Sequence, residues 1–157
     1  MASEASNRLQ IQLDILQSWL NKWNIVVNTQ KSNHITFTLR KQTCPPVFLN
    51  GTEIPSKTEV KYLGLHLDRR LTWRCHIKAK RKQLDTKVKQ MYWLLGRKSQ
   101  LSLENKVLLL KTILKPIWTY GIELWGTASN SNIEILQRFQ SKALRAITNA
   151  PYYVSNN

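Results

Sequence analysis

The stretch EVKYLGLHLDRRLTWRCHIKAKRKQLDTKVKQMYWLLG, residues 59–96, decides the fold, because its hydrophobic period changes part-way along. Up to Leu67 the apolar residues alternate as in a single β-strand, with Gly64 permitting a bulge or a close backbone approach. From Thr72 the period is about 3.6, which predicts a helix that closes at Gly96. The apolar stripe of this helix consists of Ile77, Leu84, Val88, Met91 and Leu95.

Residues 6–24 predict an amphipathic helix with a wide apolar face and a polar back that includes Gln10 and Gln17. Trp19 and Trp23 lie one turn apart beside the apolar stripe, so we expect both rings in the core. Stacking of these rings on a nucleic-acid base is the weaker alternative.

Short β-type runs follow the helix at residues 25–28 and 34–39. Residues 47–54, VFLNGTEI, predict a tight hairpin, because Asn50-Gly51 readily supplies the two positive φ angles of a type I′ turn. The first half of the chain therefore mixes one helix with antiparallel strands.

Three more helical segments are expected after residue 96. Ser102 is a candidate N-cap for an apolar stripe of Leu103, Val107, Leu110 and Leu114, and Pro116 restarts the chain because proline breaks a helix interior. The last helix spans about 132–149, with buried Ile133, Leu136, Phe139, Ala143, Leu144 and Ile147. We thus predict an α+β fold whose second half is a helical bundle.

The chain is strongly basic: 24 Lys and Arg against 9 Asp and Glu give a formal net charge of +15. Residues 69–115 hold 14 of the basic residues and two of the acids, so they carry +12 of that total. A solvated helical face explains an ordinary basic run, but an imbalance of this extent indicates a polyanionic partner. Lys78, Lys82 and Lys89 fall on one flank of the predicted helix, where they are free to meet phosphate.

An anionic membrane is the less favoured polyanion, because the chain has the apolar pattern of a globular protein. No run approaches the roughly 18 uninterrupted apolar residues that span a bilayer, and the start lacks a secretory signal. Cys44 and Cys75 match neither a disulfide framework nor a zinc site. We expect an intracellular protein, nuclear or cytoplasmic, with reduced thiols and no membrane partner.

The residues offer no visible catalytic centre. The nine acids include no Asp-Asp, Asp-x-Asp or Glu-x-Glu pair, so we expect no metal site and no cofactor within the chain. His34, His66 and His76 lack metal-ligand spacing, and we favour surface or packing roles for them. Serine and cysteine nucleophile motifs and phosphate-binding loops are also absent from the sequence.

Short motifs follow one another along nearly the whole chain: Lys22-Trp23-Asn24-Ile25, Val60-Lys61-Tyr62-Leu63-Gly64-Leu65-His66-Leu67-Asp68, Leu71-Thr72-Trp73, Trp93-Leu94-Leu95-Gly96, Leu114-Lys115-Pro116-Ile117-Trp118 and Leu124-Trp125-Gly126. In this order they resemble the distal part of the reverse transcriptases of jockey-type non-LTR retrotransposons. The resemblance implies that residues 1–69 are the end of a polymerase palm. It implies that residues 70–157 are the helical thumb and the start of the following region.

In that family the metal-binding acids lie in two palm motifs, both of which would precede residue 1. The resemblance therefore implies a fragment, truncated at both ends, of an RNA-directed DNA polymerase that uses Mg²⁺ when complete. The expected partners are an RNA template–DNA primer duplex, held by its backbone, and the remainder of the palm and fingers. The isolated chain is predicted to be inactive. It is also predicted to self-associate, because the missing strands of the palm sheet would leave part of the apolar face around Trp19 and Trp23 uncovered.

The resemblance also suggests roles for individual residues. Lys31 matches a palm lysine proposed to protonate the departing pyrophosphate, although a solvated lysine is the simpler reading of the sequence alone. Tyr62-Leu63-Gly64 matches the primer grip, where the simpler reading is a sheet residue beside a bulge. The candidates for contact with the duplex are Arg74, Lys78, Arg81, Lys82 and Lys89. A host-adopted, non-catalytic nucleic-acid-binding module is the alternative to a polymerase fragment.

Overall fold

The computed structural model describes residues 2–41, 44–151 and 153. The chain forms two compact units, Met1–Leu71 and Thr72–Asn157. Two antiparallel hairpins and a long helix in the first unit, followed by a helical second unit, confirm the predicted α+β class. The assignment of residues 1–69 to a palm and 70–157 to a thumb stays a prediction.

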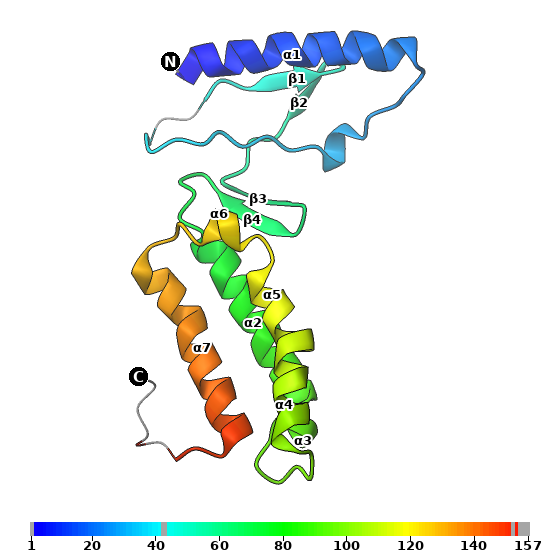
Figure 1. Cartoon of the computed structure of the whole chain (residues 1–157). Coiled ribbons are helices and arrows are strands. Elements are labelled where there is room, and N and C mark those ends of the chain that lie inside the picture. The colour runs from blue at the N-terminus through cyan, green and yellow to red at the C-terminus, as the bar shows by residue number, and fades with distance from the viewer. Residues whose placement is uncertain (1, 42–43, 152, 154–157) are drawn as a thin grey trace. The chain divides into compact units, whose positions relative to one another are not determined.

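The first unit combines one long helix, a 3-10 turn and two hairpins. Helix α1 spans Ala2–Lys22, and the 3-10 turn η1 spans Thr29–Lys31. Strand β1 (Val47–Leu49) pairs with β2 (Thr52–Ile54), and β3 (Glu59–Tyr62) pairs with β4 (Leu65–Asp68), both antiparallel. Helix α1 lies along the β1–β2 hairpin (Figure 1).

The predicted β1–β2 hairpin is confirmed, with its turn at Asn50 and Gly51. Both residues have positive φ, 51° and 69°, as a type I′ turn requires. This turn sets the register that pairs Val47 with Ile54. The inward side chains of Val47, Leu49 and Ile54 form the core cluster of the unit, against which Leu13 and Val27 pack.

Two glutamines of α1 hold the helix against the edge of β1. The Gln10 amide donates to the Phe48 carbonyl (3.0 Å) and accepts from the Phe48 N–H (2.8 Å). The Gln17 amide oxygen accepts from the Asn50 N–H at 2.9 Å. These bonds occupy main-chain groups that an edge strand otherwise leaves unpaired. The predicted polar back of α1 therefore faces the hairpin at these two positions.

The expectation that Trp19 and Trp23 are core residues is wrong. Their side chains are 51% and 61% exposed, and the two rings contact each other at a centroid distance of 6.2 Å. The β1–β2 hairpin has strands of three residues, which are too short to cover the whole length of a 21-residue helix. The side of α1 left uncovered, here called the exposed α1 face, consists of Leu9, Ile11, Ile15, Leu16, Trp19 and Trp23.

The two β-type runs predicted after α1 are also wrong, because neither 25–28 nor 34–39 forms a strand. His34 makes a single parallel bridge to Ser56, in which its N–H donates to the Pro55 carbonyl and its carbonyl accepts from the Lys57 N–H. One bridge satisfies two main-chain groups and does not extend into a ladder.

The single strand predicted up to Leu67 is in fact a second hairpin. The chain reverses at Leu63 and Gly64, whose φ angles are 47° and 79°, so that Tyr62 pairs with Leu65. Alternating apolar residues occur in either arm of a hairpin, and the glycine supplies the turn instead of a bulge.

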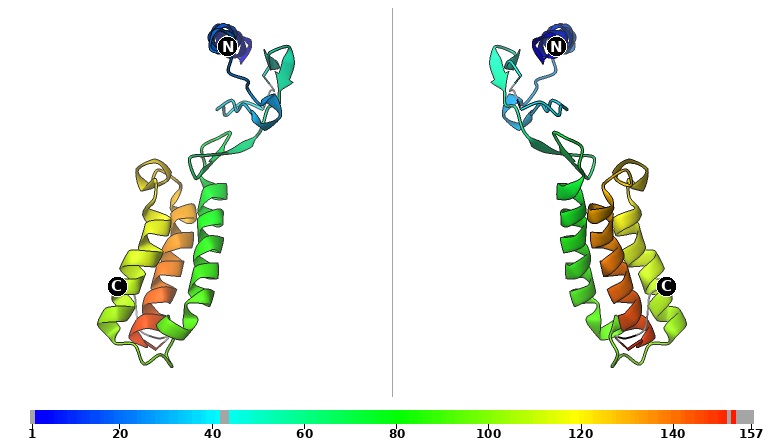
Figure 2. Two further views of the ribbon diagram at one scale, coloured as in Figure 1. Left: turned by 90° about the vertical axis from the view of Figure 1, so that its right-hand side faces the viewer. Right: turned by 90° about the vertical axis from the view of Figure 1, so that its left-hand side faces the viewer.

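The second unit is a bundle of helices. They are α2 (Arg74–Gln90), α3 (Tyr92–Leu95), α4 (Leu103–Leu109), the π-helical η2 (Leu110–Leu114), α5 (Lys115–Thr119), α6 (Ile122–Trp125) and α7 (Asn130–Thr148). The α2 and α7 helices and the α4–α5 segment lie side by side along their lengths (Figures 1 and 2). The core is largely as predicted, with buried Ile77, Leu84, Leu95, Leu110, Leu114, Leu136, Phe139, Ala143 and Ile147. The expectation is wrong for Leu103 and Leu144, which are exposed.

Local signals place the ends of these helices. The Ser102 hydroxyl accepts from the Asn105 N–H and caps α4, which confirms its predicted role. Pro116 does not interrupt the segment, because η2 widens the helix immediately before it. A proline ring collides with the carbonyl four residues earlier, here that of Thr112, and a π-helical turn relieves that contact.

Candidate nucleic-acid interface

One face of α2 carries most of the predicted contact residues. Arg74, Lys78, Lys82 and Lys89 fall within about 80° of arc on this helix, at its 100° per residue. All four side chains are exposed, and the apolar stripe around Ile77 is turned toward the core. The periodicity that buries the stripe therefore also gathers these four charges.

The face borders a hollow between α2 and α7. One part of it is lined by Lys78, Arg81, Lys82, Lys89 and Ile135. An adjoining part is lined by Lys89, Tyr92 and Lys142, together with Val88 and the paired Arg81 and Asp85. We call this surface the basic groove and define it by the cations that line it: Lys78, Arg81, Lys82 and Lys89 of α2 and Lys142 of α7.

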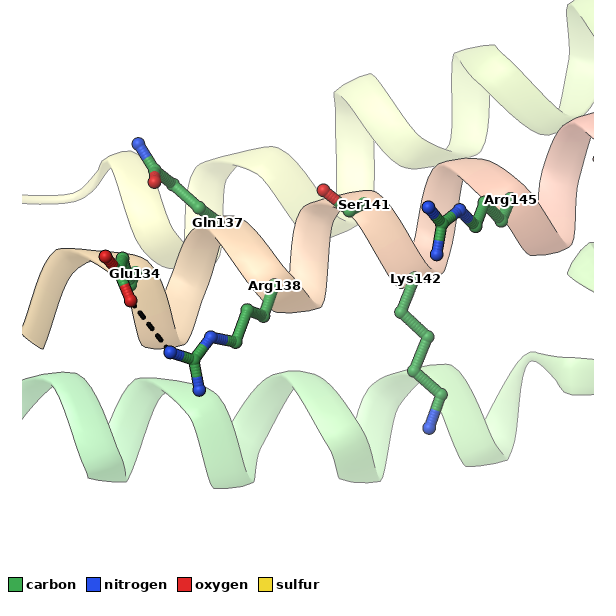
Figure 3. Close-up of a pocket in the computed structure, with 6 residues that line it drawn as sticks. All are labelled: Glu134, Gln137, Arg138, Ser141, Lys142 and Arg145. Atoms are coloured by element: carbon green, nitrogen blue, oxygen red, sulfur yellow. Dashed lines mark hydrogen bonds and ion pairs between the residues drawn. The ribbon is translucent and has the colours of Figure 1, made fainter. Parts of the chain in front are cut away.

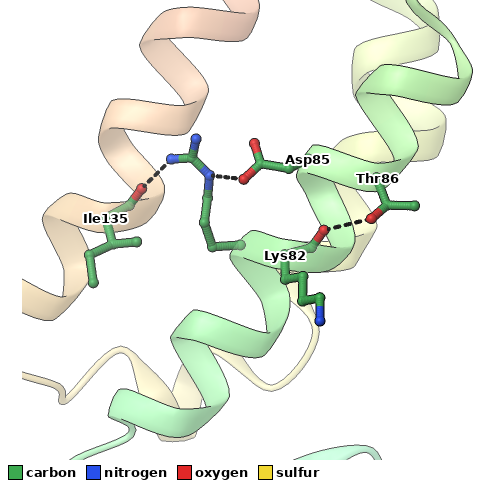
Figure 4. A network of polar contacts seen from close by, with 5 residues as sticks. Lys82, Asp85, Thr86 and Ile135 are labelled. Carbon is green, nitrogen blue, oxygen red and sulfur yellow. Dashed lines mark hydrogen bonds and ion pairs between the residues drawn. The ribbon is translucent and has the colours of Figure 1, made fainter.

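Arg81 is placed differently from its lysine neighbours. Its Nε donates to the Asp85 carboxylate at 3.0 Å, and its Nη1 donates to the Ile135 carbonyl at 3.3 Å (Figure 4). Its guanidinium also lies over the Phe139 ring, 5.1 Å from the centroid. The contacts with Ile135 and Phe139 fasten α2 to α7, and the Asp85 pair within α2 holds the guanidinium in place. Arg81 thus builds the floor of the groove and has little capacity left for a phosphate.

No carboxylate of the described residues forms an ion pair with Lys78, Lys82, Lys89 or Lys142. The ion pairs near the groove bind the arginines instead, Arg81 to Asp85 and Arg138 to Glu134. The four ammonium groups are therefore available to an external anion.

Helix α7 adds basic residues that the sequence-based prediction did not include. Arg138, Lys142 and Arg145 line a hollow along α7, and Arg138 is paired with Glu134 at 2.7 Å (Figure 3). In that view Arg138 and Lys142 extend from α7 toward α2. Arg138, Lys142 and Arg145 are four and three residues apart, a spacing that places them on one side of a helix. The sequence-based prediction missed them because they lie outside residues 69–115, where most of the net charge is concentrated.

The remaining predicted site residues lie in the first unit. Lys31 is exposed at the end of η1, where its main-chain N–H donates to the Asn28 side chain at 3.1 Å. Tyr62, Leu63 and Gly64 form the exposed tip of the β3–β4 hairpin. Lys31 and the Tyr62–Gly64 tip therefore both lie in turns, and their roles stay predictions.

Among the residues that the structure describes, no group of three or more His, Cys, Asp and Glu side chains gathers as it would around a metal ion. His76 is fully buried and packs between the rings of Trp73 and Trp125, at centroid distances of 6.2 and 6.3 Å.

In the described part of the chain no helix is long and apolar enough to cross a membrane.

Sequence comparison relates the chain to mobile-element polymerases. It is 44% identical over 138 residues to a probable RNA-directed DNA polymerase from transposon X-element of Drosophila melanogaster, a match that covers 88% of this chain. It is 40% identical over 151 residues to the RNA-directed DNA polymerase from mobile element jockey of Drosophila funebris, which covers 96% of this chain. This chain is homologous to a segment of the jockey-type retrotransposon polymerases. The resemblance inferred from the motifs is thereby confirmed.

The chain covers little of each relative. A third homologue, a probable RNA-directed DNA polymerase from transposon BS of Drosophila melanogaster, is 40% identical over 154 residues. The chain spans between 15% and 17% of the length of these relatives. No family model matches the chain, and no solved structure matches it.

Proposed function

We propose that this chain holds the template–primer duplex of a retrotransposon RNA-directed DNA polymerase by its sugar–phosphate backbone. The observation that carries the proposal is the basic groove, whose four lysines have no carboxylate partner in the described structure. The homologues support a nucleic-acid partner, since each is named as an RNA-directed DNA polymerase.

The groove suits an RNA–DNA hybrid because such a duplex is recognised mainly by A-like shape and by phosphate contacts. From Lys78 to Lys89 the helix rises about 16 Å, which is long enough to follow several successive phosphates of one strand. A lysine ammonium is a mobile point charge, which follows a phosphate backbone without reading base edges. Binding is therefore expected to be independent of sequence.

Fluorescence anisotropy with labelled RNA–DNA hybrids tests the proposal. The wild-type chain should bind two hybrids of unrelated sequence equally, with a Kd of order 10⁻⁴ to 10⁻⁶ M near physiological salt. Charge reversal of Lys78, Lys82 and Lys89 to Glu should abolish binding. Charge reversal of Lys87, exposed on the opposite side of α2, is the control. Hybrid binding that survives the triple reversal would refute the groove as the contact surface.

The first unit is proposed to act beside the polymerase active site. Lys31 would offset the charge of the departing pyrophosphate, supported by the Asn28 turn that fixes its main chain. The tip at Leu63-Gly64 would bring main chain close to the primer end, supported by its exposure and its tight turn. Acids elsewhere in a complete polymerase would hold the Mg²⁺ ions, so the isolated chain should not extend a primed template supplied with deoxynucleotides and Mg²⁺.

The exposed α1 face is proposed to pack against the remainder of the palm. Leu9, Ile15, Leu16 and the two tryptophans leave a continuous apolar strip along one side of the helix. Such a strip is unusual on a monomeric soluble surface and indicates a protein partner. In the isolated chain, the same strip should cause self-association.

A further inference from the structure

We infer that Tyr92 is a stacking platform for an unpaired base, so that the basic groove holds a single strand where it leaves the duplex. The inference rests on the proposed function, because it assigns a second ligand to one end of the same groove. It names a further binding site, at the junction of α2 and α3, and its ligand is a single-stranded nucleotide.

The first observation is the position of the Tyr92 ring. Tyr92 lines the same hollow as Lys89 and Lys142, and its side chain is 60% exposed. An aromatic ring set among cations is the arrangement that binds single strands, since the ring stacks on a base while the cations pair with phosphates. Tyr92 lies just beyond the last lysine of α2, so a strand following Lys78, Lys82 and Lys89 would reach it.

The second observation is that Gly96 lies against the ring and that its main chain is hydrogen-bonded on both sides. A Cβ at Gly96 would lie 2.6 Å from the Tyr92 carbonyl oxygen and 3.1 Å from ring atom Cε1, so the ring rests against a position that only glycine fits. The Gly96 N–H donates to the Tyr92 carbonyl at 2.7 Å. The Gly96 carbonyl accepts from the ammonium of Lys106, a lysine only 3% exposed, at 3.1 Å. These bonds hold the main chain that carries Tyr92, so the backbone needs little further ordering when a base stacks on the ring.

The ligand is an unpaired base, not a base pair, because bases inside a duplex already have both faces covered by their neighbours. An unpaired nucleotide beyond the duplex exposes a π-face, and stacking is tolerant of which base is present. The platform therefore adds affinity for a strand overhang without adding sequence specificity.

Competition binding with three hybrids tests the platform in the full chain. The first hybrid is blunt, the second carries a short single-stranded overhang, and the third carries the same overhang with abasic nucleotides, which keep the phosphates and lack the bases. Each is measured with the wild-type chain, Tyr92→Leu, Tyr92→Phe and Trp93→Leu. Trp93 is the matched control, since it is 74% exposed, adjacent in sequence and not among the residues that line this hollow. Circular dichroism confirms that each variant is folded.

The wild-type chain and Tyr92→Phe should prefer the overhang to the blunt hybrid. The preference for bases over abasic nucleotides should be about 5-fold to 150-fold, the range for one base on an aromatic side chain. Tyr92→Leu should lose that preference and still bind the blunt hybrid as the wild type does, while Trp93→Leu should change neither. Equal binding of normal and abasic overhangs by the wild type, or a preference that persists in Tyr92→Leu, overturns the platform and leaves the duplex groove intact. Binding of the overhang hybrid without any binding of the blunt hybrid would instead overturn the proposed duplex function and leave the platform intact.

Discussion

Replacing lysines of the basic groove one at a time should change the salt dependence of binding in a countable way. Lys82→Gln removes one ammonium from the groove, and Lys78→Gln with Lys82→Gln removes two. Neither side chain forms an ion pair within the described structure, so both variants should fold with unchanged stability. Lys87→Gln removes the same charge about 180° around α2 and is the matched control.

The magnitude follows from counterion release. Each phosphate contact contributes a slope of about −0.9 to log K against log salt. Loss of both contacts should therefore make the slope shallower by about 1.8. If the contacts no longer contribute near about 1 M salt, the two variants and the wild type should bind equally there. At about 0.15 M salt the double variant should then bind roughly 30-fold more weakly than the wild type, and the single variant about 5-fold more weakly. Lys87→Gln should cost less than about 2-fold, because its charge is screened over a Debye length of about 8 Å.

Anisotropy titrations of one RNA–DNA hybrid across a salt series measure both quantities. The expected pattern is a shallower line for the double variant that meets the wild-type line at high salt. Equal weakening by Lys82→Gln and Lys87→Gln would refute the reasoning, since the affinity would then follow net charge and not the groove. An unchanged slope in the double variant would equally show that these lysines do not contact phosphate.

Four further outcomes follow from individual contacts. Arg81→Ala should lower the free energy of unfolding by about 1–2 kcal/mol in urea titrations, because it removes a hydrogen bond and a ring contact between α2 and α7, and an ion pair within α2. Gly51→Ala should cost about 1 kcal/mol by the same measurement, from its positive φ alone, since the site is open. Gly96→Ala should cost more, about 1–3 kcal/mol, because the new methyl group collides with main chain. The double variant Trp19→Gln, Trp23→Gln should self-associate less in sedimentation velocity and stay folded, because both side chains are exposed. A monomeric wild-type chain would contradict this prediction.

The features predicted correctly from sequence are those set by neighbouring residues. The Asn50-Gly51 turn, the Ser102 cap and the apolar stripe of α2 depend on local dihedral preferences and helical spacing. The basic face of α2 follows from the same spacing, because a charge pattern on a helix is fixed once its buried side is known. The mutual position of Lys78 and Lys82 therefore follows from their spacing along the chain.

The features that were missed depend on residues distant in sequence. The pattern of α1 identifies an apolar side, but only the short β1–β2 hairpin decides that Trp19 and Trp23 stay uncovered. The helical spacing of α4 gave no reason to bury Lys106, whose partner is the carbonyl of Gly96 in another segment. The alternation from Val60 to Leu67 is equally consistent with one strand or with two arms of a hairpin, since both have a period of two.

The distribution of partners between arginine and lysine bears on what the groove can recognise. Guanidinium groups make the bidentate contacts by which proteins read guanine, whereas ammonium groups bind phosphate without fixed geometry. Here Arg81 and Arg138 are engaged by Asp85 and Glu134, and Arg81 is further held by a main-chain carbonyl. The lysines of the groove form no ion pair within the described structure. The groove therefore has the means to hold a backbone and little means to read bases, as the proposed function requires.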